Sequence, residues 1–549
     1  MKNEIQKLIE SALNEAKKAN DWSDFEMSEI IVDYPKSEQF GDYTTNVAMI
    51  LAKKVGKNPM EIAEIINLQL TTYNLQQFEK IEVAAPGYIN FYLSKKYLQE
   101  IVEKINVEKE KFGNSETGKN IKINNEFISA NPTGPLTVGN GRGGFYGDSL
   151  SRVLRKASFD VTNEYYVNDA GEQVIKLGHS VLKDEKAVYG GEYIEELFND
   201  LADKIDIEKK SLEDEFARSI GIDAAKIVLE KYIKPTVEKN MQITFDVWMS
   251  EKTLYDDGFV DRAIETLKNK KLTFESEGAL WLSTTQFGDD KDRVLIKSNG
   301  QKTYFASDCG YILSKMERGF VKIIEGWGAD HHGYIARFRA AAEALGFSGD
   351  LKFLIVQLVK VMKDGKEIRM SKRAGNVILI DDLIDEIGHD VTRFFFLMYS
   401  PDTHMNFDLG LAKERSSKNP VFYVQYAHAR IAGILEKAQE SGISNFQFPI
   451  SKQNEILSLL INEKELSLVR ELNKFPELVE EIAESYEVHK LPQYAMKLAD
   501  KFHSFYDACK VIDEDNKELT IARLSLINAV RIVLAETLDL IGVDAPSKM

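Results

Sequence analysis

The order of strand and helix signals in residues 121–167 restricts the fold of this chain more than any other feature of the sequence. IKINNEFI (121–128) has the β-branched, alternating pattern of a strand, FYGDSLSRVLRKASF (145–159) is helical, and DVTNEYYV (160–167) has the pattern of a second strand. Strand, helix and strand in this order form a βαβ unit, which implies a parallel sheet. Similar apolar runs return in GALWLSTT, DRVLIKS, FVKIIEGWGADHHG and KFLIVQLVKV. We therefore predict an α/β domain built on a parallel sheet.

Composition changes along the chain divide it into three regions. Residues 1–110 are expected to form an α/β unit with an amphipathic opening helix, and the charged run EKEKFGNSETGKN follows as a linker. Residues 115–410 hold the parallel sheet, and the charge-rich stretch from about 180 to 290 is expected to be a mostly helical insertion. Residues 411–549 lack strand signals, which predicts a helical bundle. Apolar residues share one helical stripe there: Leu472, Phe475, Val479 and Ile482.

The overall charge excludes some classes of protein but not a large enzyme. The 549 residues carry a net charge of -17, which speaks against a general nucleic-acid coat protein, because phosphate binding needs lysine and arginine. A local basic surface remains compatible with that total. Only two cysteines occur, so we expect no disulfide framework and no multi-cysteine zinc site. The apolar runs are far shorter than the ~20 residues that span a bilayer, and we expect a cytoplasmic protein without a membrane partner.

The glycine-rich stretch GNGRGG between the first strand and helix allows two interpretations. Gly139, Gly141 and Gly144 match G-x-G-x-x-G, the pattern of dinucleotide-binding turns. That pattern needs its first glycine directly after the strand, whereas about ten residues, including Pro132 and Pro135, intervene here. The alternative is a glycine-bearing turn at a helix N-terminus that binds nucleotide phosphates. The glycines could also serve only the close packing of helix and strand.

A second basic motif lies about 230 residues further along the chain. RMSKRAG (369–375) gathers three cations, a serine and a glycine in a loop between apolar strands. Such a loop suits a mobile clamp over a triphosphate, because cations stabilise the charge that develops during reaction. The plainer alternative is a solvated basic turn.

These two motifs resemble the signatures of class I aminoacyl-tRNA synthetases. RMSKRAG is similar to their KMSKS loop and PLTVGN to their HIGH sequence. The chain resembles the arginyl-tRNA synthetases over nearly its whole length. The stretches that carry this resemblance include EFISANPTGPLTVGNGRGG, QKTYFASDCGYILSKMERGF, WGADHHGYIARFRAAAEALGF and NPVFYVQYAHARI. The resemblance implies a multidomain fold: a Rossmann-like parallel-sheet catalytic domain, an N-terminal appended tRNA-binding domain and a helical anticodon-binding domain.

The resemblance also implies an activity and its partners. The family activates L-arginine with ATP, which enters with Mg2+, and passes the arginyl group to tRNA(Arg), usually as a monomer. We expect no structural metal, because His331 and His332 lack further ligands at metal spacing. Two rival hypotheses remain: a synthetase-like tRNA-binding regulatory protein and an NAD-dependent oxidoreductase.

Several positions match the family's catalytic and nucleotide-binding residues. The expected catalytic residues are Thr137, Gly139, Asn140, Arg369, Met370, Ser371 and Lys372. The expected ATP-binding residues are Ser129, Asn131, Pro132, Thr133, Gly134, Thr137, Gly139, Asn140, Gly141, Asp330, His331 and Lys372. The chain departs from the consensus where Thr137 and Asn140 replace the two histidines and Arg369 replaces the first lysine. Because Thr137 and Asn140 can still donate neutral hydrogen bonds, we predict an active enzyme whose signature contributes little pH dependence near 6.5.

Arginine recognition requires a carboxylate that can accept paired hydrogen bonds from a guanidinium. Tyr304 and Asp308 are four residues apart and share a face if the segment is helical. By resemblance they hold the guanidinium, Glu126 assists, and Asn131 and His331 face the α-amino and adenylate side. Without the resemblance, an aspartate in the first turn of a helix is better explained as a capping residue.

Two segments are expected to contact tRNA. By resemblance, the first lies near the tRNA elbow and contains Phe40, Asp42, Tyr43 and Asn46. The second lies on the C-terminal helices and contains Tyr423, Gln425, Tyr426 and Arg430. Aromatic residues can stack on splayed bases. Phe422 and Tyr426 are also four residues apart, however, and could simply belong to the core.

Overall fold

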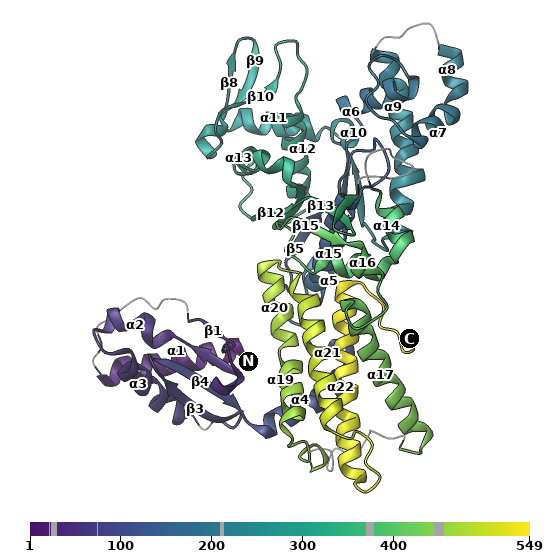
Figure 1. Ribbon diagram of the computed structural model, residues 1–549. Helices are drawn as coiled ribbons and strands as arrows, with labels where there is room; N and C mark the ends of the chain where they lie inside the picture. The colour runs from purple at the N-terminus through teal and green to yellow at the C-terminus, as the bar shows by residue number, and fades with distance from the viewer. Residues whose placement is uncertain (21, 23–29, 74, 209–213, 369–377, 444–454) are drawn as a thin grey trace.

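The computed structural model describes residues 1–549 except 21, 23–29, 74, 209–213, 369–377 and 444–454 (Figure 1). It consists of an N-terminal α/β unit, a central part built on a parallel sheet, and a column of C-terminal helices. This arrangement confirms the predicted fold class. In the described part of the chain no helix has the length and apolar content to cross a membrane.

The N-terminal unit is an antiparallel sheet covered by helices. Its strand order is β1-β2-β4-β3. The strands are β1 (Val32–Asp33), β2 (Tyr43–Thr45), β3 (Phe78–Ala84) and β4 (Tyr88–Leu93). The helices are α1 (Lys2–Asn20), α2 (Val47–Val55) and α3 (Pro59–Thr71). The α4 helix (Lys95–Glu108), also inside the predicted first region, packs instead on the C-terminal helices, where Asn106 Nδ2 donates to the Ser525 carbonyl at 3.0 Å.

The central sheet has the order β12-β11-β5-β6-β7 and is parallel throughout. Its strands are β5 (Lys122–Glu126), β6 (Asp160–Val167), β7 (Val247–Ser250), β11 (Lys322–Gly328) and β12 (Asp350–Val356). Its connecting helices include α5 (Val138–Lys156), α12 (Tyr304–Glu317) and α13 (Ile335–Leu345). The βαβ unit read from residues 121–167 is thus β5, α5 and β6. In register, Glu126 of β5 pairs with Glu164 of β6 and with Glu325 of β11, so three glutamates lie side by side.

The segment expected as one helical insertion at about 180–290 is divided by a strand. Helices come first: α6 (Glu172–Leu182), α7 (Glu192–Asp200), α8 (Ala202–Glu208), α9 (Asp214–Val228) and the π-helical turns Leu229–Ile233 and Thr236–Asn240. The chain then returns to the main sheet as β7 before α10 (Glu251–Asp256) and α11 (Phe259–Asn269). An antiparallel sheet follows: β8 (Thr273–Ser276), β9 (Ala279–Leu282) and β10 (Arg293–Ile296). The sequence did not reveal β7 because four residues are too short to show a strand period.

The C-terminal helices form a bundle beneath the central sheet (Figure 1). They are α17 (Pro420–Glu440), α19 (Glu463–Asn473), α20 (Phe475–Ser485), α21 (Lys490–Ala508) and α22 (Lys517–Ile541). Short elements link bundle and sheet: α14 (Ile380–Ile387), α15 (His389–Leu397), α16 (Leu409–Lys413), β13 (Val359–Lys363), β14 (Lys366–Ile368) and β15 (Met405–Asp408). The predicted apolar stripe of Leu472, Phe475, Val479 and Ile482 is fully buried, as expected for a bundle core.

A glutamate of the bundle fixes the N-terminal unit in place. Glu477 on α20 accepts hydrogen bonds from the hydroxyls of Tyr34 and Tyr43, the latter at 3.0 Å. Asp42 forms an ion pair with Arg470 of α19 at 3.0 Å. Because these contacts link residues more than 400 positions apart, local sequence patterns give no sign of them.

Candidate active site

The glycine-rich loop leads into α5 through a capping box. Thr137 is the N-cap residue: its Oγ1 accepts from the Asn140 backbone N–H at 3.5 Å, and the Thr137 backbone N–H donates to Asn140 Oδ1 at 3.0 Å. The Thr137 hydroxyl also donates to Asn140 Oδ1 at 2.8 Å. These bonds use the oxygen of the Asn140 amide, so its Nδ2 is the group left to donate to a ligand.

The glycines of the loop divide into two kinds. A Cβ on Gly141 would lie 2.5 Å from Ile380, one on Gly144 2.6 Å from Met241, and one on Gly147 2.2 Å from Phe127. These three glycines therefore allow close packing of α5. At Gly139 a Cβ would meet only Thr137 Oγ1, at 3.6 Å, so this backbone is open to a ligand. Two of the three glycines in the dinucleotide pattern are thus explained by packing, which weakens the nicotinamide interpretation.

The segment between β5 and α5 has a strained backbone. Ile128 and Ser129 have positive φ values of 64° and 38°, which L-residues rarely adopt. The Ser129 hydroxyl donates to Glu126 Oε1 at 2.9 Å and accepts from the Tyr166 backbone N–H at 3.0 Å. Backbone strain of this kind persists where the surroundings enforce it, commonly at ligand sites.

The three adjacent glutamates of the sheet belong to a buried ionic network. Lys315 of α12, fully buried, lies 2.7 Å from both Glu126 and Glu325. Burial would lower the pKa of Lys315, but its two carboxylate partners raise it to about 12. Tyr311 donates to Glu126 at 2.6 Å and to Glu164 at 2.5 Å. Glu126, expected to assist arginine binding, is therefore neutralised by a lysine and supports the floor of the site.

Asp308 lies on α12, as predicted, but it does not cap the helix. The N-cap residue is Thr303, whose Oγ1 accepts from the Ala306 backbone N–H at 3.3 Å. Burial, together with the nearby charge of Glu251, raises the pKa of Asp308 to about 7, while Arg337 opposes the shift. Its side chain retains partial exposure but is densely surrounded by protein. The capping alternative is therefore wrong, and Asp308 is a partly buried carboxyl group whose charged form Arg337 favours and Glu251 opposes.

Tyr304 lies one turn earlier on the same helix. Its side chain is 44% exposed, and its hydroxyl accepts from the Glu172 backbone N–H at 2.5 Å. Tyr304 therefore links α12 to the start of α6. The spacing of four residues places it on the face of α12 that carries Asp308.

Sequence reasoning missed Glu251, the first residue of α10. Glu251 is 3% exposed, and its buried Oε2 has no hydrogen-bond partner among the residues that the structure describes. Burial raises the pKa of Glu251, a hydrogen bond with the Ser307 side chain opposes the rise, and the nearby charge of Asp169 adds to it. A buried carboxylate oxygen without a donor is costly unless a ligand supplies one. In the sequence Glu251 is one acid at a helix start, a placement that the helix dipole alone explains.

The remaining predicted ligand residues lie around the same strand ends. Asp330 and His331 follow β11, are exposed, and approach each other to 3.5 Å. Asn131 is exposed, Pro132 is buried, and Thr133 and Gly134 are half-buried in the loop before α5. The RMSKRAG motif, with Arg369, Met370, Ser371 and Lys372, lies outside the described residues. The segment after it is joined to the signature loop, because the Val138 and Ile380 N–H groups donate to the Ile378 and Leu136 carbonyls at 3.1 and 3.0 Å.

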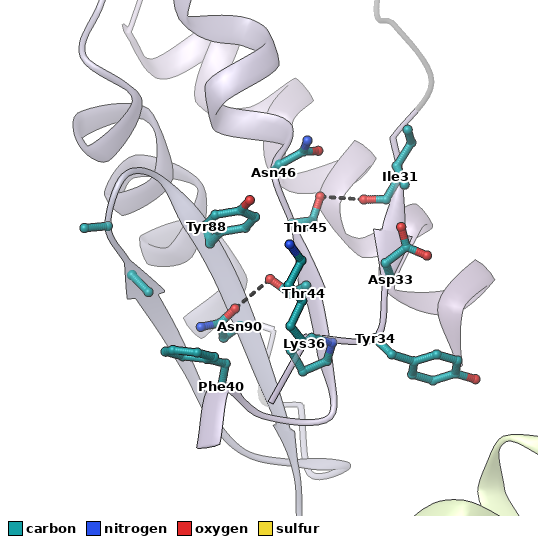
Figure 2. A pocket seen from close by; sticks show the side chains of 13 residues that line it. Ile31, Asp33, Tyr34, Lys36, Phe40, Thr44, Thr45, Asn46, Tyr88 and Asn90 are labelled. Atoms are coloured by element: carbon teal, nitrogen blue, oxygen red, sulfur yellow. Dashed lines mark hydrogen bonds between the residues drawn. The ribbon is translucent and has the colours of Figure 1, made fainter. Parts of the chain in front are cut away.

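The predicted N-terminal tRNA contacts separate into two groups. Phe40 and Asn46 line a cavity of about 470 Å³ together with Tyr88 (Figure 2). Phe40 and Tyr88 are 45% and 38% exposed, and the buried Asn46 Oδ1 has no hydrogen-bond partner within the described part of the chain. Asp42 and Tyr43 instead face the bundle, where Tyr43 is 1% exposed. Their side chains are thus occupied in holding the N-terminal unit.

The predicted C-terminal tRNA contacts separate in the same way. On α17, Tyr426 is 40% exposed and lies parallel to Phe422, with centroids 6.4 Å apart. The Arg430 guanidinium lies 5.0 Å from the Tyr426 ring centre, and Tyr423 packs against His503 at 4.9 Å. Gln425 instead donates to Asp390 Oδ2 at 2.8 Å and to the Asp544 carbonyl at 2.9 Å, joining α17 to α15.

The fold and site define the class of protein. The chain has a parallel sheet, its first crossover helix begins at a glycine-bearing turn, and a helical bundle is attached. This is the architecture of a class I aminoacyl-tRNA synthetase. Family models agree: the class I (R) catalytic domain of tRNA synthetases matches residues 101–394, the arginyl-tRNA synthetase N-terminal domain residues 3–93, and the DALR anticodon-binding domain residues 424–549.

Similar proteins identify the family. The arginine–tRNA ligase of Listeria welshimeri is 45% identical over 99% of this chain and 98% of its own length. That of Bacillus subtilis is 42% identical over 100% and 99%. The Thermus thermophilus arginyl-tRNA synthetase structure covers 100% of both chains with a TM-score of 0.76 at 22% identity, which supports the fold. The chain belongs to the arginyl-tRNA synthetase family. The predicted ATP-dependent ligase is confirmed, and neither the nicotinamide enzyme nor the regulatory protein is favoured.

Proposed function

We propose that this protein activates L-arginine with ATP at the carboxyl ends of β5, β6 and β11 and transfers the arginyl group to tRNA(Arg). The observation that carries the proposal is the pair Asp308 and Glu251: burial and the charge of Glu251 raise the pKa of Asp308 to about 7, and the buried Glu251 Oε2 has no hydrogen-bond partner among the described residues. An arginine guanidinium supplies the positive charge and the donors that this pair lacks.

The arginine pocket uses residues from three elements. Asp308 and Tyr304 of α12 contact the guanidinium, and the free Glu251 Oε2 accepts one of its N–H groups. Asn131 and His331, both exposed at the strand ends, face the α-amino group and the adenylate. Glu126 acts indirectly, because its bonds to Lys315, Tyr311 and Ser129 fix the floor beneath them.

ATP lies against the loop of residues 129–134 and the start of α5. The open backbone of Gly139, the Asn140 Nδ2 and the positive end of the α5 dipole receive the phosphates. An arginine carboxylate oxygen attacks the α-phosphorus, pyrophosphate leaves, and a terminal ribose hydroxyl of tRNA then displaces AMP from the arginyl carbonyl. Lys372 and its neighbours supply cations to the pyrophosphate, and Mg2+ enters bound to ATP.

The tRNA contacts two surfaces. The cavity lined by Phe40, Tyr88 and Asn46 receives an unstacked base, because two aromatic side chains and an unsatisfied amide oxygen offer stacking and a hydrogen-bond acceptor. The exposed face of α17, with Tyr426 and Arg430, contacts the anticodon loop. Asp42, Tyr43 and Gln425 hold domains together instead. The enzyme works as a monomer in the cytoplasm.

Aminoacylation with purified protein, ATP, Mg2+, tRNA and labelled arginine tests this proposal. We expect arginine to become linked to tRNA by the native protein and the Asp308→Asn variant to lose most of that activity. Binding of tRNA without any transfer of arginine by the native protein would refute the proposal.

A further inference from the structure

The helical insertion reaches back to the loop that precedes α5. Tyr193, the second residue of α7, is 7% exposed, and its hydroxyl donates to the Thr133 carbonyl at 3.0 Å. A Cβ on Gly134 would lie 3.2 Å from the same tyrosine's Cζ and hydroxyl oxygen. The ring of Tyr193 therefore lies directly against the backbone of Gly134, a contact that glycine permits.

A second tyrosine of the insertion contacts the same threonine. Tyr189 lies in the segment between α6 and α7. Burial raises the pKa of the Tyr189 hydroxyl, and a hydrogen bond with the Thr133 side chain opposes that rise. Tyr189 also donates to Gln173 Oε1 at the start of α6. Tyr193 thus holds Thr133 at its carbonyl, and Tyr189, bonded to Gln173, lies beside the Thr133 side chain.

The loop needs such external support because its own backbone bonds are few and irregular. Ile128 and Ser129 have positive φ values, and the Thr133 N–H donates to the carbonyl of Asn131, only two residues earlier, at 2.7 Å. A tight turn next to strained residues keeps one conformation only where neighbours fix it. The two tyrosines supply that constraint from an element outside the parallel sheet.

We propose that Tyr193 and Tyr189 are positioning residues that hold the loop of residues 131–134 in its ATP-binding conformation, so that the helical insertion sets the affinity for ATP. The inference rests on the proposed binding of ATP to this loop. It assigns the insertion a role in the first step of the reaction, separate from any contact with tRNA.

The test measures arginine-dependent ATP–pyrophosphate exchange, with tRNA present, for the Tyr193→Phe and Tyr189→Phe variants. Each variant keeps the ring and removes one hydroxyl, so both are expected to fold, and thermal melting confirms it. We expect KM for ATP to rise about fivefold in each variant, which corresponds to about 1 kcal/mol, the size of one hydrogen bond. For Tyr193→Phe, KM for arginine and kcat are expected to stay within twofold of the native values.

Tyr232→Phe is the matched control. Tyr232 packs edge-on against Tyr193, and its hydroxyl donates to Glu196 within the insertion. Its loss is expected to leave KM for ATP unchanged. If the native protein shows no arginine-dependent exchange, the proposed function fails. If the native protein is active but Tyr193→Phe and Tyr189→Phe have the native KM for ATP, or Tyr232→Phe raises it equally, the positioning role is refuted while the function stands.

Discussion

The proposed contact between Asp308 and the arginine guanidinium makes arginine binding depend on pH, in a direction and range set by the pKa of Asp308. Burial and the charge of Glu251 raise this pKa to about 7, so the free enzyme carries a mostly protonated Asp308 below that pH. A protonated carboxyl group cannot attract a guanidinium as a carboxylate does. The guanidinium itself stays charged throughout, so the change in affinity belongs to the enzyme.

The magnitude follows from the titration. With a pKa of about 7, the ionised fraction of Asp308 is about one tenth at pH 6 and about nine tenths at pH 8. We therefore expect kcat/KM for arginine, which reports the free enzyme, to rise about tenfold between these values. Because bound arginine holds Asp308 ionised, binding at pH 6.5 is expected to release about three quarters of a proton.

Two measurements check this expectation. One is the pH profile of kcat/KM for arginine at saturating ATP and Mg2+. The other is calorimetric titration of the enzyme with arginine in buffers of different ionisation enthalpy, which counts the protons released. In the Glu251→Gln variant the affinity is expected to fall, because a guanidinium partner is lost, and the break in the profile is expected to move to lower pH, because a neighbouring negative charge is gone. A flat profile from pH 6 to 8 with no proton release would refute the reasoning.

Three further changes test other parts of the structure. Lys315→Met leaves two buried glutamates without their cation and is expected to destabilise the protein by about 3–5 kcal/mol, measured by denaturant unfolding; a loss below about 1 kcal/mol would contradict the buried network. Gly178→Ala places a Cβ 1.7 Å from the Ala217 carbonyl oxygen and is expected to lower the free energy of unfolding by more than about 3 kcal/mol, measured by thermal melting. Gly190→Ala, with open space around its Cβ, is the control in the same experiment. Tyr426→Ala is expected to raise KM for tRNA by about fivefold or more without changing KM for ATP, since stacking on one base contributes about 1–3 kcal/mol. An unchanged KM for tRNA would show that the exposed face of α17 does not contact tRNA.

The features that local sequence order determines were predictable. The βαβ unit at residues 121–167 correctly gave a parallel sheet, and the stripe at residues 472–482 gave a buried bundle face. The short β7 strand was not predictable, because its four residues acquire their role only by pairing with β6. For the same reason, the segment around it was expected to be one helical insertion.

The use of individual polar residues was harder to predict than the fold. Tyr43 and Gln425 have the residue types of RNA contacts, yet they bond to Glu477 and Asp390. Those partners lie 434 and 35 positions away, and a side chain's exposure depends on where such distant segments pack. Glu251 shows the converse: an ordinary helix-start acid in the sequence becomes a binding candidate only when its buried, unsatisfied oxygen is seen beside Asp308.

The pH response of the enzyme is expected to come from the arginine pocket with Asp308 and Glu251. The capping box of Thr137 and Asn140 is not expected to contribute to it. Thr137 and Asn140, which replace the histidines of the family's usual signature, bond to each other and carry no titrating group. In the proposed ATP site the phosphates therefore meet a neutral amide, open backbone at Gly139 and a helix dipole, none of which titrates near neutral pH. Asp308, in the proposed arginine pocket, has a pKa raised to about 7 by burial and by the charge of Glu251. A pH dependence that appears in kcat/KM for arginine and survives in Asn140→Ala belongs to Asp308. A pH dependence that Asn140→Ala abolishes would instead come from the signature loop. It would contradict the neutral role of Thr137 and Asn140.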